Sequence, residues 1–249
     1  MIGFDYLGIA VLLLFLGLLI GFAAFGHRWP MVLRSIRGFD ELNTAIERAV
    51  EAGERVHLSL GTGSVIGSDS APALAGLAML SRVATATTMS DKPVVVTAGD
   101  GAMALLAQDT LRAAYERAKA SERFQPISGR MLGPTPFSYV ASLPILISTE
   151  GVSVHLLAGS FGAEGALAAD FGEHQEAFVL AGTDDAQSQA LLYATAEYPL
   201  IGEEVFAGGA YLKVGPFHLA SLRTQDMVRV LIVALILIGT ILSTLGVSL

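Results

Sequence analysis

Residues 56–69 read VHLSLGTGSVIGSD, a short apolar run that stops at a glycine and continues into small and polar residues. The same order recurs three more times along the chain. The further runs are Pro93–Ala98 before Gly99, Val152–Ala158 before Gly159, and Phe178–Ala181 before Gly182. A helical pattern follows each glycine turn. Repetition of strand, glycine turn and helix predicts an α/β fold with a Rossmann-like, mostly parallel sheet flanked by helices and a crevice at the carboxyl ends of its strands.

Two uncharged stretches of 20 residues flank this region, Tyr6–Phe25 and Val230–Leu249. Twenty residues of helix cover about 30 Å, the thickness of the hydrocarbon core of a bilayer. We therefore expect one transmembrane helix at each end of the chain. The first is read as a retained anchor, because Asp5 stands where a cleaved signal peptide would carry basic residues.

The charges nearest the two spans predict the topology. The bases on the domain side of the spans are Arg28, Arg34, Arg37, Arg223 and Arg229, whereas the outer ends carry only Asp5. Because cytoplasmic segments are enriched in Arg and Lys, we expect a two-pass protein of the inner membrane with its soluble domain in the cytoplasm and both termini outside. The expected parts are an anchor over residues 1–27, an α/β domain over 28–220 and a second membrane helix over 221–249.

Composition removes several classes of function. The chain has 249 residues, a net charge of −8 and only 15% charged residues, against about 25% in typical globular proteins. It contains three lysines and no cluster of basic and aromatic residues, which argues against a nucleic-acid partner. The absence of cysteine excludes disulfides, thiolate catalysis and cysteine-bound metal.

Helical patterns fill the spaces between the predicted strands. The expected helices are one that starts at an Asp40 N-cap and closes at Gly53, and others over residues 71–87, 102–120, 163–172 and 186–196. The segment Phe124–Pro136 is a loop by composition, and Gly202–Gly215 leads back to the membrane. Residues 137–147 are apolar but contain Pro144, which fits a kinked helix against the sheet or against the bilayer surface.

The glycine-rich segment Gly61–Asp69 resembles the phosphate-binding loop of dinucleotide-binding folds, because its glycines permit close backbone approach and the following helix offers free N–H groups. Its G-x-G-x-x-x-G spacing is one residue longer than the usual fingerprint, and no phosphate-loop lysine follows. Two interpretations stay open, an anion or nucleotide site and a turn that only reverses the chain.

Polar residues at the other predicted strand ends extend this candidate site. The candidate ligand-binding residues are Gly61, Thr62, Gly63, Ser64, Gly67, Ser68, Asp69, Asp100, Gly101, Ser160, Thr183 and Asp184. Carboxylates at one sheet edge can hold Mg²⁺, bind ribose hydroxyls or act as acid and base, but Asp69, Asp100, Asp184 and Asp185 can equally cap helices. No catalytic residue, metal ligand or cofactor is assigned.

His57 and His155 each stand four residues before the glycine that ends their strand. In a parallel sheet they would occupy matching positions in its body, away from the ligand-binding edge. We therefore expect hydrogen-bonded core histidines and not metal ligands.

Several segments resemble an uncharacterised prokaryotic membrane-protein family, a domain of unknown function with two terminal transmembrane helices and a Rossmann-like soluble domain. The segments that carry this resemblance are Leu58–Gly63, Val96–Gly101, Ala104–Asp109, Pro136–Tyr139, Leu191–Ala196 and Pro199–Glu204. The resemblance implies an architecture and supplies no catalytic residue.

Two functional hypotheses follow. The first is a non-enzymatic cytoplasmic module that organises or assembles at the lipid bilayer, as a homo-oligomer or with other membrane proteins. Gly17 and Gly21 form a small-xxx-small pair that can let two membrane helices approach closely. The alternative is a sensor or enzyme that binds a nucleotide or another small anionic ligand at the carboxyl edge of the sheet.

Overall fold

The computed structural model describes residues 6–26 and 32–245. Asp5 and Arg28, which enter the topology argument, lie outside the described residues. The chain divides into two compact units. Residues 34–214 form the α/β unit, and residues 1–33 together with 215–249 form a helical unit.

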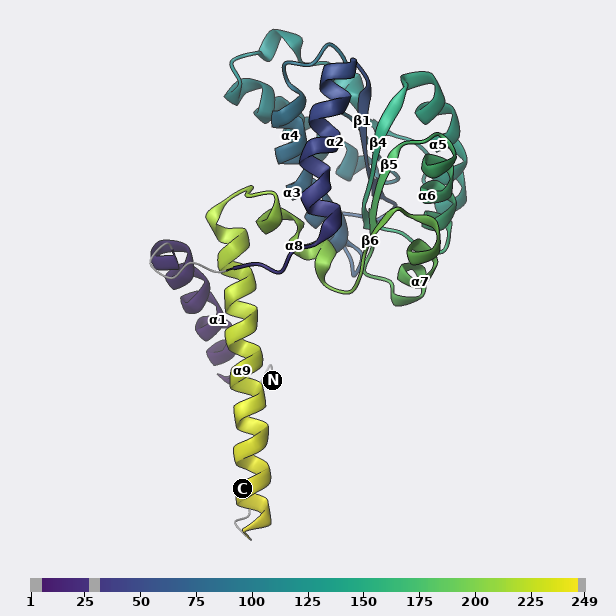
Figure 1. The fold of residues 1–249 in the computed structure, drawn as a ribbon. Helices are drawn as coiled ribbons and strands as arrows, with labels where there is room; N and C mark the ends of the chain where they lie inside the picture. Colours follow the sequence, from purple (N-terminus) through teal and green to yellow (C-terminus); the bar gives the residue numbers. More distant parts are fainter. Residues whose placement is uncertain (1–5, 27–31, 246–249) are drawn as a thin grey trace, which may run out of the picture. The chain divides into compact units, whose positions relative to one another are not determined.

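Six parallel strands build one sheet in the order β3-β2-β1-β4-β5-β6 (Figure 1). Their bounds are Arg55–Gly61 for β1, Val95–Ala98 for β2, Gly129–Met131 for β3, Val152–Ser160 for β4, Phe178–Gly182 for β5 and Tyr198–Leu200 for β6. The predicted Rossmann-like α/β fold is thereby confirmed. The chain builds outward from β1 through β2 to β3, and then returns to the other side of β1 for β4, β5 and β6.

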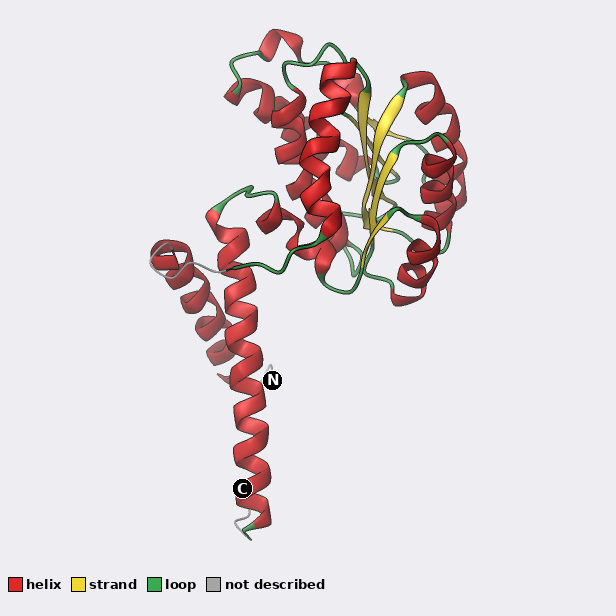
Figure 2. Ribbon diagram, viewed as in Figure 1, coloured by secondary structure: helices red, strands yellow, loops and turns green. Residues whose placement is uncertain are grey.

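Helices cover both faces of the sheet (Figure 2). On one face lie α2 (Arg37–Ala52), α3 (Ser70–Thr87), α4 (Gly101–Arg117) and α8 (Glu204–Tyr211), and on the other lie α5 (Pro136–Glu150), α6 (Glu164–His174) and α7 (Ala186–Thr195). Two 3-10 turns, Ser121–Arg123 and Pro126–Ser128, precede β3.

The core consists of one apolar layer on each face of the sheet. Alternate residues of a strand point to opposite faces, so Leu58 and Leu60 pack under α2 and α3, while His57 and Ser59 face α5. The layer under α5, α6 and α7 contains Leu143, Leu157 and Val179. Covering both faces of a parallel sheet leaves only its edges open for a ligand.

The structure corrects three expectations about elements. The first helix of the α/β unit begins at Arg37 with Ile36 at its N-cap, so Asp40 lies in the first turn, where the Ser35 hydroxyl donates to it. Gly53 ends this helix in the left-handed region, at φ +66°, as predicted. The predicted loop 124–136 contains β3, and α8 occupies most of the segment 202–215. Strand β6 was also not predicted.

The segment 137–147 belongs to α5, which continues through Pro144 to Glu150. The hydroxyl of Thr135 caps its N-terminus by accepting the Ser138 N–H at 3.4 Å. Tyr139, Leu143 and Ile147 are buried against the sheet. Of the two alternatives that the sequence left open, packing against the sheet is therefore correct.

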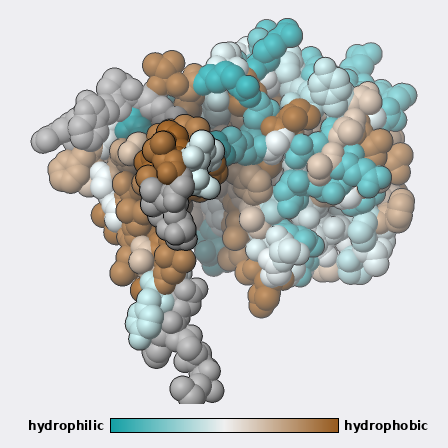
Figure 3. Space-filling view, turned by 90° about the horizontal axis from the view of Figure 1, so that it is seen from below, coloured by the Kyte–Doolittle hydropathy of each residue, from teal (hydrophilic) through white to brown (hydrophobic). Residues whose placement is uncertain are grey.

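The helical unit contains α1 (Tyr6–Phe25) and α9 (Pro216–Thr244), which pack against one another. Both helices are long and apolar enough to cross a membrane. Brown in Figure 3 marks the apolar residues on the visible surface of the molecule. α9 begins at Pro216, well before the predicted uncharged span that starts at Val230. Near the start of α9, Arg223 donates from Nη1 to the Gly26 carbonyl, which follows α1, at 2.7 Å.

Candidate functional site

The carboxyl ends of β1 and β4 form the point at which the strand order of the sheet reverses. The connections that leave these two strands run to opposite faces of the sheet, to α3 and to α6. In open α/β sheets the ligand-binding crevice lies between two such connections. Gly61 pairs with Ser160 at this point, after a register shift that follows Ser59. The predicted glycine-rich loop therefore lies where open α/β sheets bind their ligands.

Close packing explains two glycines of this loop. Gly61 has φ +71°, and a Cβ there would lie 2.0 Å from the Ser160 carbonyl oxygen. A Cβ on Gly63 would lie 2.5 Å from the backbone carbonyl oxygen of Asp69 and 2.9 Å from the Ser160 Cβ. Both positions exclude a side chain whether or not a ligand binds. Gly67 differs, because its φ is +130° while no described atom lies within 4 Å of its Cβ position.

Backbone and side-chain hydrogen bonds join the loops after β1, β2 and β4. The Thr62 N–H donates to the Ser160 carbonyl at 3.1 Å, and the Gly99 N–H donates to the Gly61 carbonyl at 2.8 Å. The hydroxyl of Ser64 lies 3.4 Å from Oδ2 of Asp100. The structure thus brings the candidate residues of the first three loops together at the crevice, including the exposed Gly101 at the start of α4.

The predicted carboxylates have different roles. Asp100 caps α4, because its Oδ1 accepts the Met103 N–H at 3.0 Å. Asp185 caps α7 in the same way, and its hydrogen bonds from Ser188 lower its pKa. Asp69 stands at the N-cap position of α3 but makes no capping hydrogen bond, and its Oδ1 accepts from Ser68 at 2.7 Å. Asp69 and Asp184 are exposed.

Thr183 is fully buried and holds the neighbouring turn in place. Its Oγ1 accepts the Phe161 N–H at 3.1 Å and donates to the Phe161 carbonyl at 3.0 Å. The next turn contains Glu164, a buried carboxylate that accepts the Gly162 N–H at 2.9 Å. Sequence reasoning missed Glu164, although it follows β4 in a glycine-rich segment, because the sequence does not show that an acidic residue in the first turn of a helix is buried.

A chain of buried polar side chains lies beneath the glycine-rich loop, on the face that α5 covers. Nδ1 of His57 is 2.8 Å from Nδ1 of His155, and Nε2 of His57 is 2.9 Å from the Thr97 hydroxyl. The Tyr139 hydroxyl lies 2.6 Å from that of Thr97 and 2.5 Å from that of Ser59. All five residues are fully buried. The matching positions of the histidines are confirmed, since His57 pairs with His155 in register.

Burial keeps this chain uncharged. It lowers the pKa of His155 to about 4 and lowers the pKa of His57 well below its usual value, with a further contribution from His155 itself. Burial also raises the pKa of Tyr139 to about 12, against the opposing effect of hydrogen bonds from Ser59 and Thr97. Near pH 7 the five side chains are therefore neutral donors and acceptors.

The strand ends themselves carry no base. Residues 61–69, 99–101, 159–164 and 182–185 contain neither Lys nor Arg. An anion in the crevice would therefore be held by backbone N–H groups and by the positive end of a helix. Within the described residues, no group of three His, Asp or Glu side chains is arranged to hold a metal ion.

Comparison with known proteins gives a single finding. The model of a family described as a domain of unknown function (DUF6754) matches residues 4–249. No curated protein and no solved structure matches the chain.

Proposed function

We infer that the chain, which belongs to the DUF6754 family, is a membrane-anchored module whose α/β unit binds a nucleotide at the carboxyl edge of its sheet. The observation that carries this proposal is the coincidence of the Gly61–Asp69 loop with the reversal of strand order between β1 and β4. Parallel α/β sheets bind ligands at this point, since the two diverging connections leave the crevice uncovered.

The start of α3 supplies the chemistry for an anion. The helix has 18 residues, and Asp69 at its N-cap accepts no N–H from the first turn, so these groups keep their hydrogen-bonding capacity. Gly67 is exposed and carries no side chain that would separate a phosphate from the backbone. Together with the free N–H groups of the first turn, it favours contact between a phosphate and the loop.

The charges at the crevice favour a particular kind of nucleotide. With Asp69 and Asp100 nearby and no base at the strand ends, a triphosphate would meet net repulsion. A dinucleotide brings only a pyrophosphate and offers ribose hydroxyls as donors. Oδ2 of Asp100, whose contact with Ser64 is long at 3.4 Å, is placed to accept such a donor. We therefore propose a dinucleotide and assign binding without a reaction.

Thermal unfolding of the detergent-solubilised full chain tests this proposal with NAD⁺, ADP, ATP and inorganic phosphate as probes. We expect NAD⁺ at 100 times its Kd to stabilise the protein by about 2.7 kcal/mol, and ATP to have less effect. Asp100→Asn should weaken NAD⁺ binding while keeping the helix cap, because an amide oxygen can also accept the Met103 N–H. Asp91→Asn, whose side chain is 99% exposed, is the control. If none of the four probes changes the melting temperature at millimolar concentration, the proposal is wrong.

We further propose that α1 and α9 span the inner membrane, with the α/β unit in the cytoplasm and both termini outside. This orientation is supported by four arginines of the described residues that stand in the sequence between the apolar parts of the two helices, namely Arg34, Arg37, Arg223 and Arg229.

A second candidate function, assembly into a homo-oligomer, has its own support in α1. No described atom lies within 4 Å of a Cβ on Gly17 or Gly21, so this small-residue surface is open to a second helix. Blue-native mass in mild detergent tests it. Gly17→Leu with Gly21→Leu should shift an oligomer to monomer, while Gly239→Leu, at an equally open position of α9, should not. A monomeric wild-type particle contradicts assembly.

A further inference from the structure

We propose that Tyr139 positions the glycine-rich loop and that the buried chain from Ser59 to His155 holds Tyr139 in place for this task. The inference rests on the proposed function in one respect, that this loop is the ligand-binding element. It adds a set of positioning residues, none of which would touch the ligand.

The buried chain connects four elements across the interior. It starts on β4 at His155, crosses β1 at His57, reaches β2 at Thr97 and ends between Tyr139 of α5 and Ser59 of β1. Each step is a hydrogen bond between fully buried atoms, where an unmade bond is costly. The four elements are therefore fixed relative to one another next to the crevice.

The end of this chain lies directly under the loop. Ser59 precedes Gly61 by two residues, and the register of β1 against β4 shifts between them. Thr97, the other partner of the Tyr139 hydroxyl, likewise precedes Gly99 by two residues, and the Gly99 N–H donates to the Gly61 carbonyl. On the other side, a Cβ on Gly133 would lie 2.6 Å from the Tyr139 backbone nitrogen, so the loop after β3 packs on the same turn of α5. Tyr139 thus lies between β1, which leads into the glycine-rich loop, and the loop after β3.

The chain can donate in either direction, and Nε2 of His155 has no hydrogen-bond partner among the described residues in both cases. In one direction the proton of the neutral His155 ring is on Nε2, and its Nδ1 accepts. His57 then donates from Nδ1 to His155. The hydroxyl of Thr97 donates to His57, that of Tyr139 to Thr97, and that of Ser59 to Tyr139. In both directions the Tyr139 hydroxyl is hydrogen-bonded to Ser59 and to Thr97, two residues before the glycines that end β1 and follow β2.

Hydrogen exchange of the full chain in detergent tests the positioning role before any ligand is added. In Tyr139→Phe, the Ser59 and Thr97 hydroxyls lose a partner beside Gly61, while the buried ring is kept. We expect the amides of Thr62 and Gly99, which are hydrogen-bonded between the loops, to exchange about tenfold faster or more, with β5 amides unchanged. Ser142→Ala is the control on the same helix, since its exposed hydroxyl bonds only within α5. Faster exchange over the whole sheet, or no change in the loop, would overturn the proposal.

A second variant keeps the test decisive if Tyr139→Phe does not fold. Thr97→Val replaces a hydroxyl by a methyl of similar size and separates Tyr139 from the histidines. It should also speed exchange at the Thr62 and Gly99 amides, and unchanged exchange there would contradict the role of the chain.

Titration with NAD⁺ separates this inference from the proposed function. If wild type binds NAD⁺, Tyr139→Phe should bind about tenfold more weakly, and equal affinity counts against positioning. If wild type does not bind NAD⁺, the dinucleotide proposal fails, and the exchange of the loop amides still decides whether Tyr139 positions the loop.

Discussion

At the scale of single residues, the His57–His155 pair ties the stability of the α/β unit to pH. Burial lowers the pKa of both rings, and that of His155 falls to about 4 from 6.5. Between these values the unfolded chain binds protons that the folded chain does not bind. The free energy of unfolding is therefore highest above pH 6.5 and falls as the pH drops toward 4, by about 3 kcal/mol for His155 alone.

Urea unfolding of the full chain in detergent at several pH values between 4 and 7 measures this dependence. In His155→Asn the side-chain oxygen replaces Nδ1 as the acceptor for His57 but does not titrate, so the decline with falling pH should be shallower. Ser142→Ala is the control, because its side chain does not titrate and its hydroxyl bonds only within α5. A wild-type stability that stays constant from pH 7 to pH 4 would contradict the assignment of two neutral buried rings.

Single residues also show the reach of sequence reasoning. Gly53 could be predicted from the local pattern, because helices commonly end with a left-handed glycine at a fixed place. Gly61 could be predicted as a turn glycine because it follows an apolar run, but its left-handed conformation could not. The register of His57 with His155 followed from equal distances to two glycines. Tyr139 could not be linked to Ser59, which is 80 residues away, because only the strand order and the placement of α5 bring them together.

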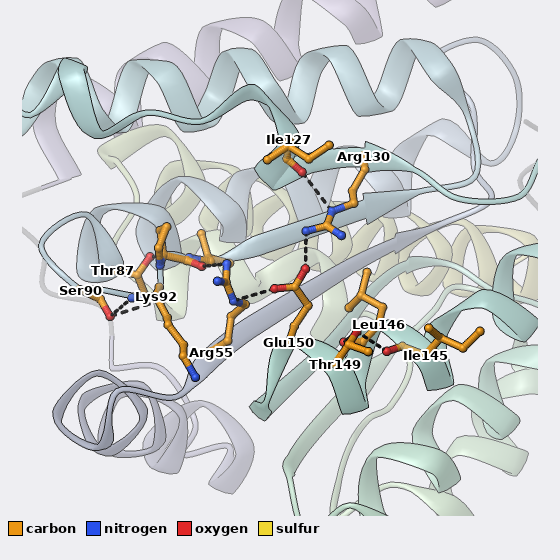
Figure 4. Close-up of polar contacts among 12 residues, drawn as sticks. Arg55, Thr87, Ser90, Lys92, Ile127, Arg130, Ile145, Leu146, Thr149 and Glu150 are labelled. Atoms are coloured by element: carbon orange, nitrogen blue, oxygen red, sulfur yellow. Dashed lines mark hydrogen bonds and ion pairs between the residues drawn. The ribbon is translucent and has the colours of Figure 1, made fainter.

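At the scale of elements, an ion-pair group at the amino edge of the sheet joins β1, β3 and the end of α5 (Figure 4). Glu150 accepts from Arg130 at 2.6 Å and pairs with Arg55 at 3.2 Å, and all three side chains are at most 28% exposed. Arg55 also donates to the Pro93 carbonyl and Arg130 to that of Ile127, so both guanidinium groups are held in place.

Glu150→Gln should lower the free energy of unfolding by about 1–3 kcal/mol, because it leaves two partly buried cations without their shared counter-charge. Thermal unfolding of the full chain measures the loss. Asp91→Asn is the matched control, since Asp91 pairs with Arg123 at 3.7 Å while its side chain is 99% exposed, and its loss should have almost no effect. Equal melting temperatures for wild type and Glu150→Gln would show that the group contributes nothing to stability.

The elements that the sequence did not predict are short or lack a period. β3 and β6 have three residues each, too few for an alternating pattern, and they form because neighbouring strands offer a ladder. α8 is rich in Gly and Ala, which weakens its apolar signal. Longer elements such as α3 and α5 were recognised, although the partner of α5 required the fold. The candidate site was predicted as a set of loops. The sequence could not show that the Asp100 side chain caps its helix while Asp69, at the N-cap of α3, makes no capping hydrogen bond.

At the scale of the whole molecule, the orientation of the chain in a membrane makes the sharpest prediction. α9 has 29 residues, about 43 Å of helix, which exceeds the hydrocarbon core of a bilayer. Its charged residues Arg223, Asp226 and Arg229 all precede the uncharged stretch 230–244. The first turns of α9 should therefore lie in the headgroup region or beyond it, on the side of the α/β unit, where basic residues favour the cytoplasm.

Single cysteines test this orientation, because the chain has no cysteine of its own. Glu47→Cys lies on the exposed face of α2, and Ile2→Cys precedes the first uncharged stretch, Tyr6–Phe25, in the sequence. In intact expressing cells, a membrane-impermeant maleimide should label Ile2→Cys and leave Glu47→Cys unlabelled. After permeabilisation both should react, which shows that each thiol is accessible. Labelling of Glu47→Cys in intact cells would place the α/β unit outside the cell, where no cytoplasmic nucleotide could reach it. The arginines next to the spans would then also lie on the side of the membrane that the positive-inside rule disfavours.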